Sequence, residues 1–202
     1  MNKCIIVGKP NVGKTAFLIN FVEYLGVKKL EFNFQLPDGT KLKKKYTYRT
    51  ALRELVDKTP HKTLSLQSVT VEMPMGKGKK KIQLVDTTGL IDYIHDSEEV
   101  RKAISQTISE ILDSQIILHV IDGSAVKKKD FFSSPSEVDY QIAQVAHSKK
   151  GYVILVNKMD LPEAEEGLKI IKKEFSGNLI IPISAIHKRG FKEVKTFVAY
   201  NI

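Results

Sequence analysis

Eight residues near the start of the chain have the types and the spacing of a phosphate-binding loop. Residues 8–15 read GKPNVGKT and fit the pattern G-x-x-x-x-G-K-[ST] between an apolar strand and a helix. The glycines let the backbone turn tightly, so we expect the N–H groups from Asn11 to Ala16 to point at phosphate oxygens. Lys14 is expected to reach the terminal phosphates, and the Thr15 hydroxyl to ligate Mg²⁺. The alternative, a glycine turn before an ordinary helix, is weaker in this context, so the pattern predicts a nucleotide site.

A second group of polar residues indicates which base is bound. The β-branched run at residues 153–156 ends in the sequence NKMD. The Asp160 carboxylate can accept hydrogen bonds from both the N1–H and the exocyclic amine of guanine, a pair that adenine lacks. Asn157 is expected to tether neighbouring loops, and the stem of Lys158 to cover one face of the base. On its own this string is weak, because Asn and Asp are common turn residues after strands.

Two other predicted strands end in residues that suit the same ligand. Residues 81–85 lead into DTTG, where Asp86 can hold Mg²⁺ through water and the bare Gly89 lets its N–H approach a γ-phosphate. Residues 179–183 lead into Ser184 and Ala185, where a backbone N–H could meet the guanine O6 atom. The four motifs together predict a guanine nucleotide site.

In this order, GKPNVGKT, DTTG, NKMD and SA resemble the motifs of the translation-factor-type GTPases. The G-x-P-N-V-G-K-[ST] form is similar to the branch that contains TrmE, Era, EngA, EngB and the septins. The resemblance covers nearly the whole chain as one GTPase domain, residues 1–202, and implies a Mg²⁺-dependent switch that hydrolyses GTP slowly to GDP and phosphate. The nucleotide-binding residues that it implies are Gly8, Asn11, Val12, Gly13, Lys14, Thr15, Ala16, Asn157, Lys158, Asp160, Ser184 and Ala185.

The resemblance also implies residues for hydrolysis. Thr63 is favoured over Thr59 as the switch threonine, because PHKT at residues 60–63 resembles the P-G-K-T of EngB-like proteins. Leu90 stands where Ras-like enzymes carry the glutamine that orients water. In relatives with asparagine at the position of Asn11, that side chain coordinates K⁺, which we expect here; the alternative is an asparagine that caps its own turn. The implied catalytic residues are Lys14, Asn11, Thr63 and Gly89, and the implied Mg²⁺ ligands are Thr15, Thr63 and Asp86.

The elements that must position these residues alternate along the chain as in an α/β fold. Apolar periodicity predicts a doubly wound sheet with the site at the carboxyl ends of its strands. We expect a P-loop GTPase fold with a mostly parallel six-stranded sheet, one antiparallel edge strand and helices on both faces. An extra β-hairpin is predicted at about residues 30–48, within an insertion at residues 30–58 of the first switch region. Further predicted segments are a short helix in residues 49–57, an antiparallel pair at 64–73 and 80–85, helices at 97–112, 136–148 and 191–200, and a strand at 115–121.

The composition of the chain indicates the number of domains and the cellular compartment. The chain has 202 residues, one cysteine and no long apolar run, which fits one domain in a reducing compartment, with the cytoplasm as the default. Cys4 is expected to be buried, as is His119, whereas His95 falls in the second mobile loop. The oligomeric state is not indicated.

The net charge of +9 favours a polyanionic partner such as ribosomal RNA, although solvated lysine-rich loops are an equal alternative. The lysines cluster as Lys41, Lys43, Lys44 and Lys45, as Lys77, Lys79, Lys80 and Lys81, and as Lys127, Lys128 and Lys129. Sequence reasoning therefore favours a GTPase switch in RNA or ribosome assembly. The alternatives are a regulatory module that recruits protein or membrane partners and, if NKMD is accidental, an ATP-using enzyme.

Overall fold

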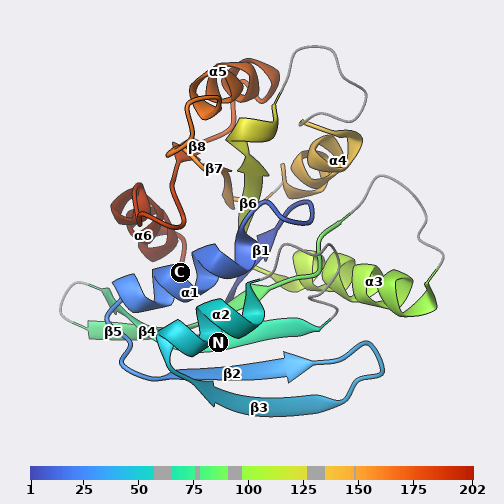
Figure 1. Ribbon diagram of the computed structural model, residues 1–202, viewed down its shortest axis with the longest axis vertical. Helices are drawn as coiled ribbons and strands as arrows, with labels where there is room; N and C mark the ends of the chain where they lie inside the picture. Colours follow the sequence, from blue (N-terminus) through green and yellow to red (C-terminus); the bar gives the residue numbers. More distant parts are fainter. Residues whose placement is uncertain (57–64, 76–77, 91–96, 127–134, 148) are drawn as a thin grey trace.

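A mixed sheet of eight strands, in the order β3-β2-β4-β5-β1-β6-β7-β8, organises the computed structural model (Figure 1). The structure describes residues 1–56, 65–75, 78–90, 97–126, 135–147 and 149–202. Several residues named above lie outside these ranges, and they are Thr59, Thr63, Lys77, His95, Lys127, Lys128 and Lys129.

The element bounds follow the sequence predictions closely. The strands are β1 (Asn2–Val7), β2 (Leu30–Gln35), β3 (Lys41–Tyr46), β4 (Leu66–Met75), β5 (Gly78–Asp86), β6 (Ile116–Asp122), β7 (Gly151–Asn157) and β8 (Ile180–Pro182). The helices are α1 (Lys14–Tyr24), α2 (Tyr48–Leu55), α3 (Glu98–Asp113), α4 (Glu137–Ala146), α5 (Ala164–Glu174) and α6 (Phe191–Tyr200), with a short 3₁₀ turn η1 (Gly123–Ala125). The predicted α/β fold, with the extra hairpin, is confirmed.

Five neighbouring strands of the sheet are parallel. β5, β1, β6, β7 and β8 pair in parallel, in that order. Their carboxyl ends therefore meet at one edge of the sheet, where ligands bind in open α/β folds. Every predicted motif follows one of these ends, so the topology gathers them.

The hairpin changes the expected size of the sheet. β2 and β3 pair with each other, and β2 also pairs antiparallel with β4, so β4 is an interior strand rather than the antiparallel edge. Leu30 and Phe32 explain this attachment, because both side chains of β2 are fully buried against the main core. The six expected strands are thereby extended to eight, with β3 at the edge.

Helices cover the sheet on both sides, as Figure 1 shows. Alternate residues of β1 enter different cores: Cys4 and Ile6 belong to the cluster with α1, α2 and α6, whereas Ile5 and Val7 belong to the cluster with α3, α4 and α5. Cys4 is fully buried, as expected. Among the described residues, no helix has the length and apolar character that crossing a membrane requires.

Candidate nucleotide-binding site

The loop between β1 and α1 turns tightly and contains residues with positive φ. Gly13 has a φ of 97°, and Asn11 has a φ of 62°, which is uncommon for a residue with a side chain. A Cβ atom at position 13 would lie 2.4 Å from Asn157 Nδ2, so only glycine fits between the loop and that amide. The sequence around residues 8–15 is therefore matched to its tight turn.

Lys14 is held inside this loop. Its side chain is buried, and its Nζ atom donates to the carbonyl oxygens of Gly8 at 3.1 Å and Lys9 at 2.8 Å. Burial lowers the pKa of Lys14 to about 8, although the charges of Asp86 and Asp139 raise it in part. A phosphate in the loop would oppose that lowering, because its negative charge favours the protonated amine.

Thr15 and Asp86 meet beside Lys14. Thr15 Oγ1 donates to Asp86 Oδ2 at 2.5 Å, which joins the start of α1 to the end of β5. Burial raises the pKa of Asp86 to about 6, against the lowering effects of Lys14 and Thr15. Its other oxygen, Oδ1, is buried and has no hydrogen-bond partner among the described residues. A hydroxyl next to an unsatisfied carboxylate oxygen suits Mg²⁺, which binds few protein ligands together with nucleotide phosphates.

Gln67, which the sequence did not single out, lies opposite Asp86. The two residues are partners in the β4–β5 register, and Gln67 is almost fully buried. Gln67 Oε1 also has no hydrogen-bond partner among the described residues. The sequence shows only that a polar residue interrupts an apolar alternation at position 67. That this residue pairs with Asp86 follows from the strand register, which the structure defines.

The segment after β5 lies against the phosphate loop. A Cβ atom at Gly89 would be 2.5 Å from Pro10 N, and Leu90 N donates to Gly8 O at 3.2 Å. The side chain of Leu90 is buried in the core with Ile5. DTTG and GKPNVGKT therefore pack directly together, while Leu90 faces away from solvent.

Asn157 joins the two halves of the site. Its Nδ2 atom donates to Val12 O at 2.8 Å, and its Oδ1 atom accepts from Ala185 N at 2.9 Å. Asn157 is 2% exposed, so water cannot replace these bonds without an opening of the loops. One side chain thus ties the phosphate loop to the SA loop.

Asp160 is oriented by Ser184. Ser184 Oγ donates to Asp160 Oδ1 at 2.5 Å, and this hydrogen bond lowers the pKa of Asp160, which keeps it ionised. Lys158 forms an ion pair with Asp122 at the end of β6. Asp122 is a residue that sequence reasoning missed, although it follows a parallel strand as Asp86 does.

Both backbone N–H groups of the SA loop make hydrogen bonds within the protein. The N–H of Ser184 donates to Arg189 O at 3.3 Å, and the N–H of Ala185 donates to Asn157. Asn157 thus fixes the backbone of Ala185, and the contact of this loop with the guanine O6 atom stays a prediction. Ser184 also contacts Asp160 through its hydroxyl.

The buried histidine of β6 has a structural environment, as expected. His119 lies between Tyr152 OH, 3.0 Å from Nδ1, and Asp139 Oδ1, 3.1 Å from Nε2. Burial is the largest influence on the pKa of Asp139 and raises it, but the bonds from His119 and Ser136 lower it below its usual range overall. The network fixes the start of α4, where Ser136 and Asp139 form a capping box.

Comparison with protein families agrees with this geometry. The family model described as "50S ribosome-binding GTPase" matches residues 41–158, more than half of the chain. The GTPase Obg of Bacillus licheniformis is 28% identical over 114 residues, which are 55% of this chain and 26% of that protein. The GTPase Obg of Desulfatibacillum aliphaticivorans is 27% identical over 150 residues, 73% of this chain and 43% of that protein. The chain thus spans about a quarter to less than half of these relatives.

Solved structures share the fold at low sequence identity. A point variant of Aquifex aeolicus Era bound to GDP·AlF₄⁻ gives a TM-score of 0.65 at 18% identity, covering 99% of this chain and 56% of that chain. An Era complex with MgGDPNP and nucleotides 1506–1542 of 16S ribosomal RNA gives 0.66 at 20% identity, with the same coverage. The G domain of the Thermotoga maritima FeoB iron transporter gives 0.55 at 20% identity, covering 100% and 98% of the two chains.

Proposed function

Because the chain belongs to the family described as 50S ribosome-binding GTPase, we propose that it binds GTP and hydrolyses it slowly to GDP and phosphate as a molecular switch. In this proposal residues 1–202 form the GTPase domain, and residues 30–58 are an insertion in its first switch region. GTP would hold both mobile segments against Mg²⁺ and the γ-phosphate, and hydrolysis would release them. We propose a cytoplasmic location.

The observation that carries the proposal is the double contact of Asn157 with Val12 and Ala185, next to the Asp160 carboxylate that Ser184 orients. This arrangement supports a base pocket fixed relative to the phosphates, in which Asp160 selects guanine. Calorimetry with GTP and ATP, on the wild type and on Asp160→Ala, tests it. We expect GTP to bind at least 100-fold more tightly than ATP, because an unmatched buried polar group costs roughly 1–3 kcal/mol for each lost hydrogen bond.

Asp160→Ala should remove this preference, whereas Asp113→Ala, at the exposed end of α3, should keep it. Equal affinity of the wild type for GTP and ATP would refute guanine selectivity.

The Mg²⁺ site is proposed at Thr15 and Asp86, with Thr63 as a third ligand. The contact between Thr15 and Asp86 supports the first two; Thr63 lies outside the described residues. When bound, Mg²⁺ would neutralise charge on the β- and γ-phosphates. The roles of this chain are to supply the hydroxyl and the carboxylate, and to hold Lys14 beside them.

For hydrolysis we propose Lys14 and the Gly89 N–H as phosphate donors, with K⁺ at Asn11. Leu90 is buried and cannot hydrogen-bond to the attacking water, which supports a different source of positive charge. Single-turnover hydrolysis in KCl and in NaCl, for the wild type and Asn11→Ala, tests the K⁺ role. We expect faster hydrolysis in KCl for the wild type alone, and equal rates in the two salts would refute it.

The cellular role is proposed in ribosome or RNA assembly, which the charge of +9 supports. The alternative is a regulatory module that recruits protein or membrane partners through the β2–β3 hairpin, with no RNA role. Affinity capture from cell extract, with GDP or a non-hydrolysable GTP analogue, separates the two. Partners lost after nuclease treatment would support the RNA role, whereas GTP-dependent capture that resists nuclease would support the alternative.

A further inference from the structure

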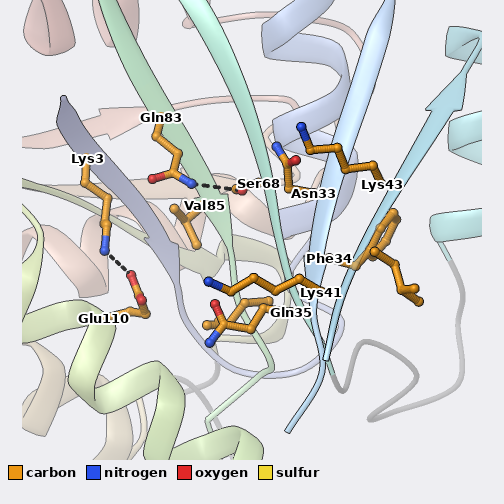
Figure 2. Close-up of a pocket in the computed structure, with 12 residues that line it drawn as sticks. Lys3, Asn33, Phe34, Gln35, Lys41, Lys43, Ser68, Gln83, Val85 and Glu110 are labelled. Carbon is orange, nitrogen blue, oxygen red and sulfur yellow. Dashed lines mark hydrogen bonds and ion pairs between the residues drawn. The ribbon is translucent and has the colours of Figure 1, made fainter. Parts of the chain in front are cut away.

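A groove of about 450 Å³ opens on the face of the sheet opposite to α1, α2 and α6. β3 bounds it on one side, and β1 and α3 on the other. In Figure 2 the side chain of Lys41 extends into the groove, while Lys3 and Glu110 meet at the opposite wall. The groove is separate from the phosphate loop, and none of the nucleotide-site residues named above lines it.

The lining of the groove combines basic and amide side chains with four apolar ones, Phe34, Leu42, Leu66 and Val85. Lys3 Nζ lies 2.6 Å from Glu110, which is the only carboxylate among the described lining residues, so its charge is compensated. Lys41 and Lys43 add two positive charges at the other wall. The nearest acid to Lys43, Glu31, is 3.9 Å away, and both side chains are largely exposed, so this pair is weak.

The floor carries side-chain amides, which both donate and accept hydrogen bonds. Asn33 and Gln35 come from β2, and Gln83 comes from β5, where its Nε2 atom donates to Ser68 Oγ at 3.0 Å. Asn and Gln amides match the paired donors and acceptors on base edges. Lysines at the wall and amides on the floor therefore suit a ligand with phosphates on one side and bases on the other.

More lysines continue this surface along the same face. Side chains alternate along a strand, so Lys45 shares a face with Lys41 and Lys43 on β3. Lys79 and Lys81 share a face with Gln83 on β5. Lys45 lies 3.8 Å from Glu31 and Lys79 lies 3.6 Å from Glu72, and because these pairs are exposed they compensate the lysine charges only weakly. The lysines therefore outnumber the acids beyond the groove as well.

We propose that this groove binds a strand of RNA, with Lys41 and Lys43 on phosphates and the amides of Asn33, Gln35 and Gln83 on bases. The inference rests on the proposed function for the choice of an RNA partner. Charge complementarity supports a polyanion, and the concave shape disfavours a flat membrane surface. An acidic peptide would satisfy the lysines but offers no bases to the amides.

The test is fluorescence anisotropy of a labelled single-stranded RNA of mixed sequence, titrated with the full chain at several KCl concentrations. The variant Lys41→Gln/Lys43→Gln removes two phosphate contacts from the groove. Lys172→Gln/Lys173→Gln is the matched control, because it removes the same charge from exposed positions at the end of α5. Gln35→Glu, which places a carboxylate on the floor, is a second variant.

Two lost contacts to a single strand lower the salt slope by about 1.4, which is about a 25-fold loss of affinity near 0.1 M salt. We expect this loss for the groove variant, a comparable fall for Gln35→Glu and less than a threefold change for the control. Equal losses in the groove and control variants would overturn the proposal. So would equally tight, equally sensitive binding of polyglutamate or of phosphatidylglycerol vesicles.

GTP affinity measured on the same samples separates the two proposals. Wild type that binds GTP but no RNA would overturn the groove assignment and leave the GTPase proposal intact. Wild type that binds RNA through the groove but no GTP would overturn the GTPase proposal and leave the groove assignment intact. Thermal melts check that each variant is folded.

Discussion

Replacement of Asn157 by alanine should destabilise the protein more than any surface substitution. The change removes the donor to Val12 O at 2.8 Å and the acceptor for Ala185 N at 2.9 Å. Each buried group left without a partner costs about 1–3 kcal/mol, so the free energy of unfolding should fall by about 2–6 kcal/mol. That loss is a large share of the roughly 5–15 kcal/mol that stabilises a typical domain.

Urea unfolding of nucleotide-free protein, followed by circular dichroism, measures this loss. Asn178→Ala is the matched control, because its amide makes one local bond, to Phe175 O at 3.3 Å after α5. We expect the control to change the free energy of unfolding by less than about 1 kcal/mol. Asn157→Asp separates the two bonds, since it keeps the acceptor for Ala185 N but turns an oxygen toward Val12 O.

Saturating GDP gives a second readout for the same variants. Asn157 connects the loops of the proposed phosphate and base sites, so GDP should raise the melting temperature of Asn157→Ala less than that of wild type. If Asn157→Ala and Asn178→Ala unfold within about 1 kcal/mol of each other, the buried bridge does not hold the loops, and the reasoning is refuted.

Three further outcomes are expected. Gly89→Ala should lower GTP affinity or turnover, because its Cβ atom would lie 2.5 Å from Pro10 N; unchanged binding and single-turnover kinetics would contradict this contact. Burial raises the pKa of the Cys4 thiol, so Ellman's reagent should modify the native protein very slowly and the urea-unfolded protein rapidly. The pKa of Asp139 is lowered in the folded state, so its ionised form stabilises the protein above the unfolded value of about 3.9. The stability gap between wild type and Asp139→Asn, from urea unfolding, should therefore be widest near neutral pH and shrink as the pH falls below about 4; a constant gap would speak against this network.

Local sequence patterns predicted most of the fold, because each element carries its own periodicity. The alternation of Phe32, Phe34 and Leu36, followed by a Pro-Asp-Gly turn, was enough to predict the β2–β3 hairpin. The same pattern did not say where the hairpin would attach. That depends on register with β4, where Asn33 pairs with Ser68, and such long-range pairing leaves no local signal.

The residues of the candidate site likewise fall into those that the sequence predicted and those that only the structure brings together. The motif residues were found from spacing, since chemistry restricts which types can contact phosphate and guanine. Gln67 and Asp139 were missed, because their positions beside Asp86 and His119 arise only when separate strands and helices pack.

The lysines of β3 also bear on how copies of this protein meet one another. An edge strand with free N–H and C=O groups invites a strand from another molecule. Four of the six residues of β3 are lysine, on both faces of the strand, so a second copy would bring like charges together. At the opposite edge β8 has only three residues, a poor template for pairing. We therefore expect both edges of the sheet to disfavour strand pairing with a second copy, β3 by charge repulsion and β8 by its short length.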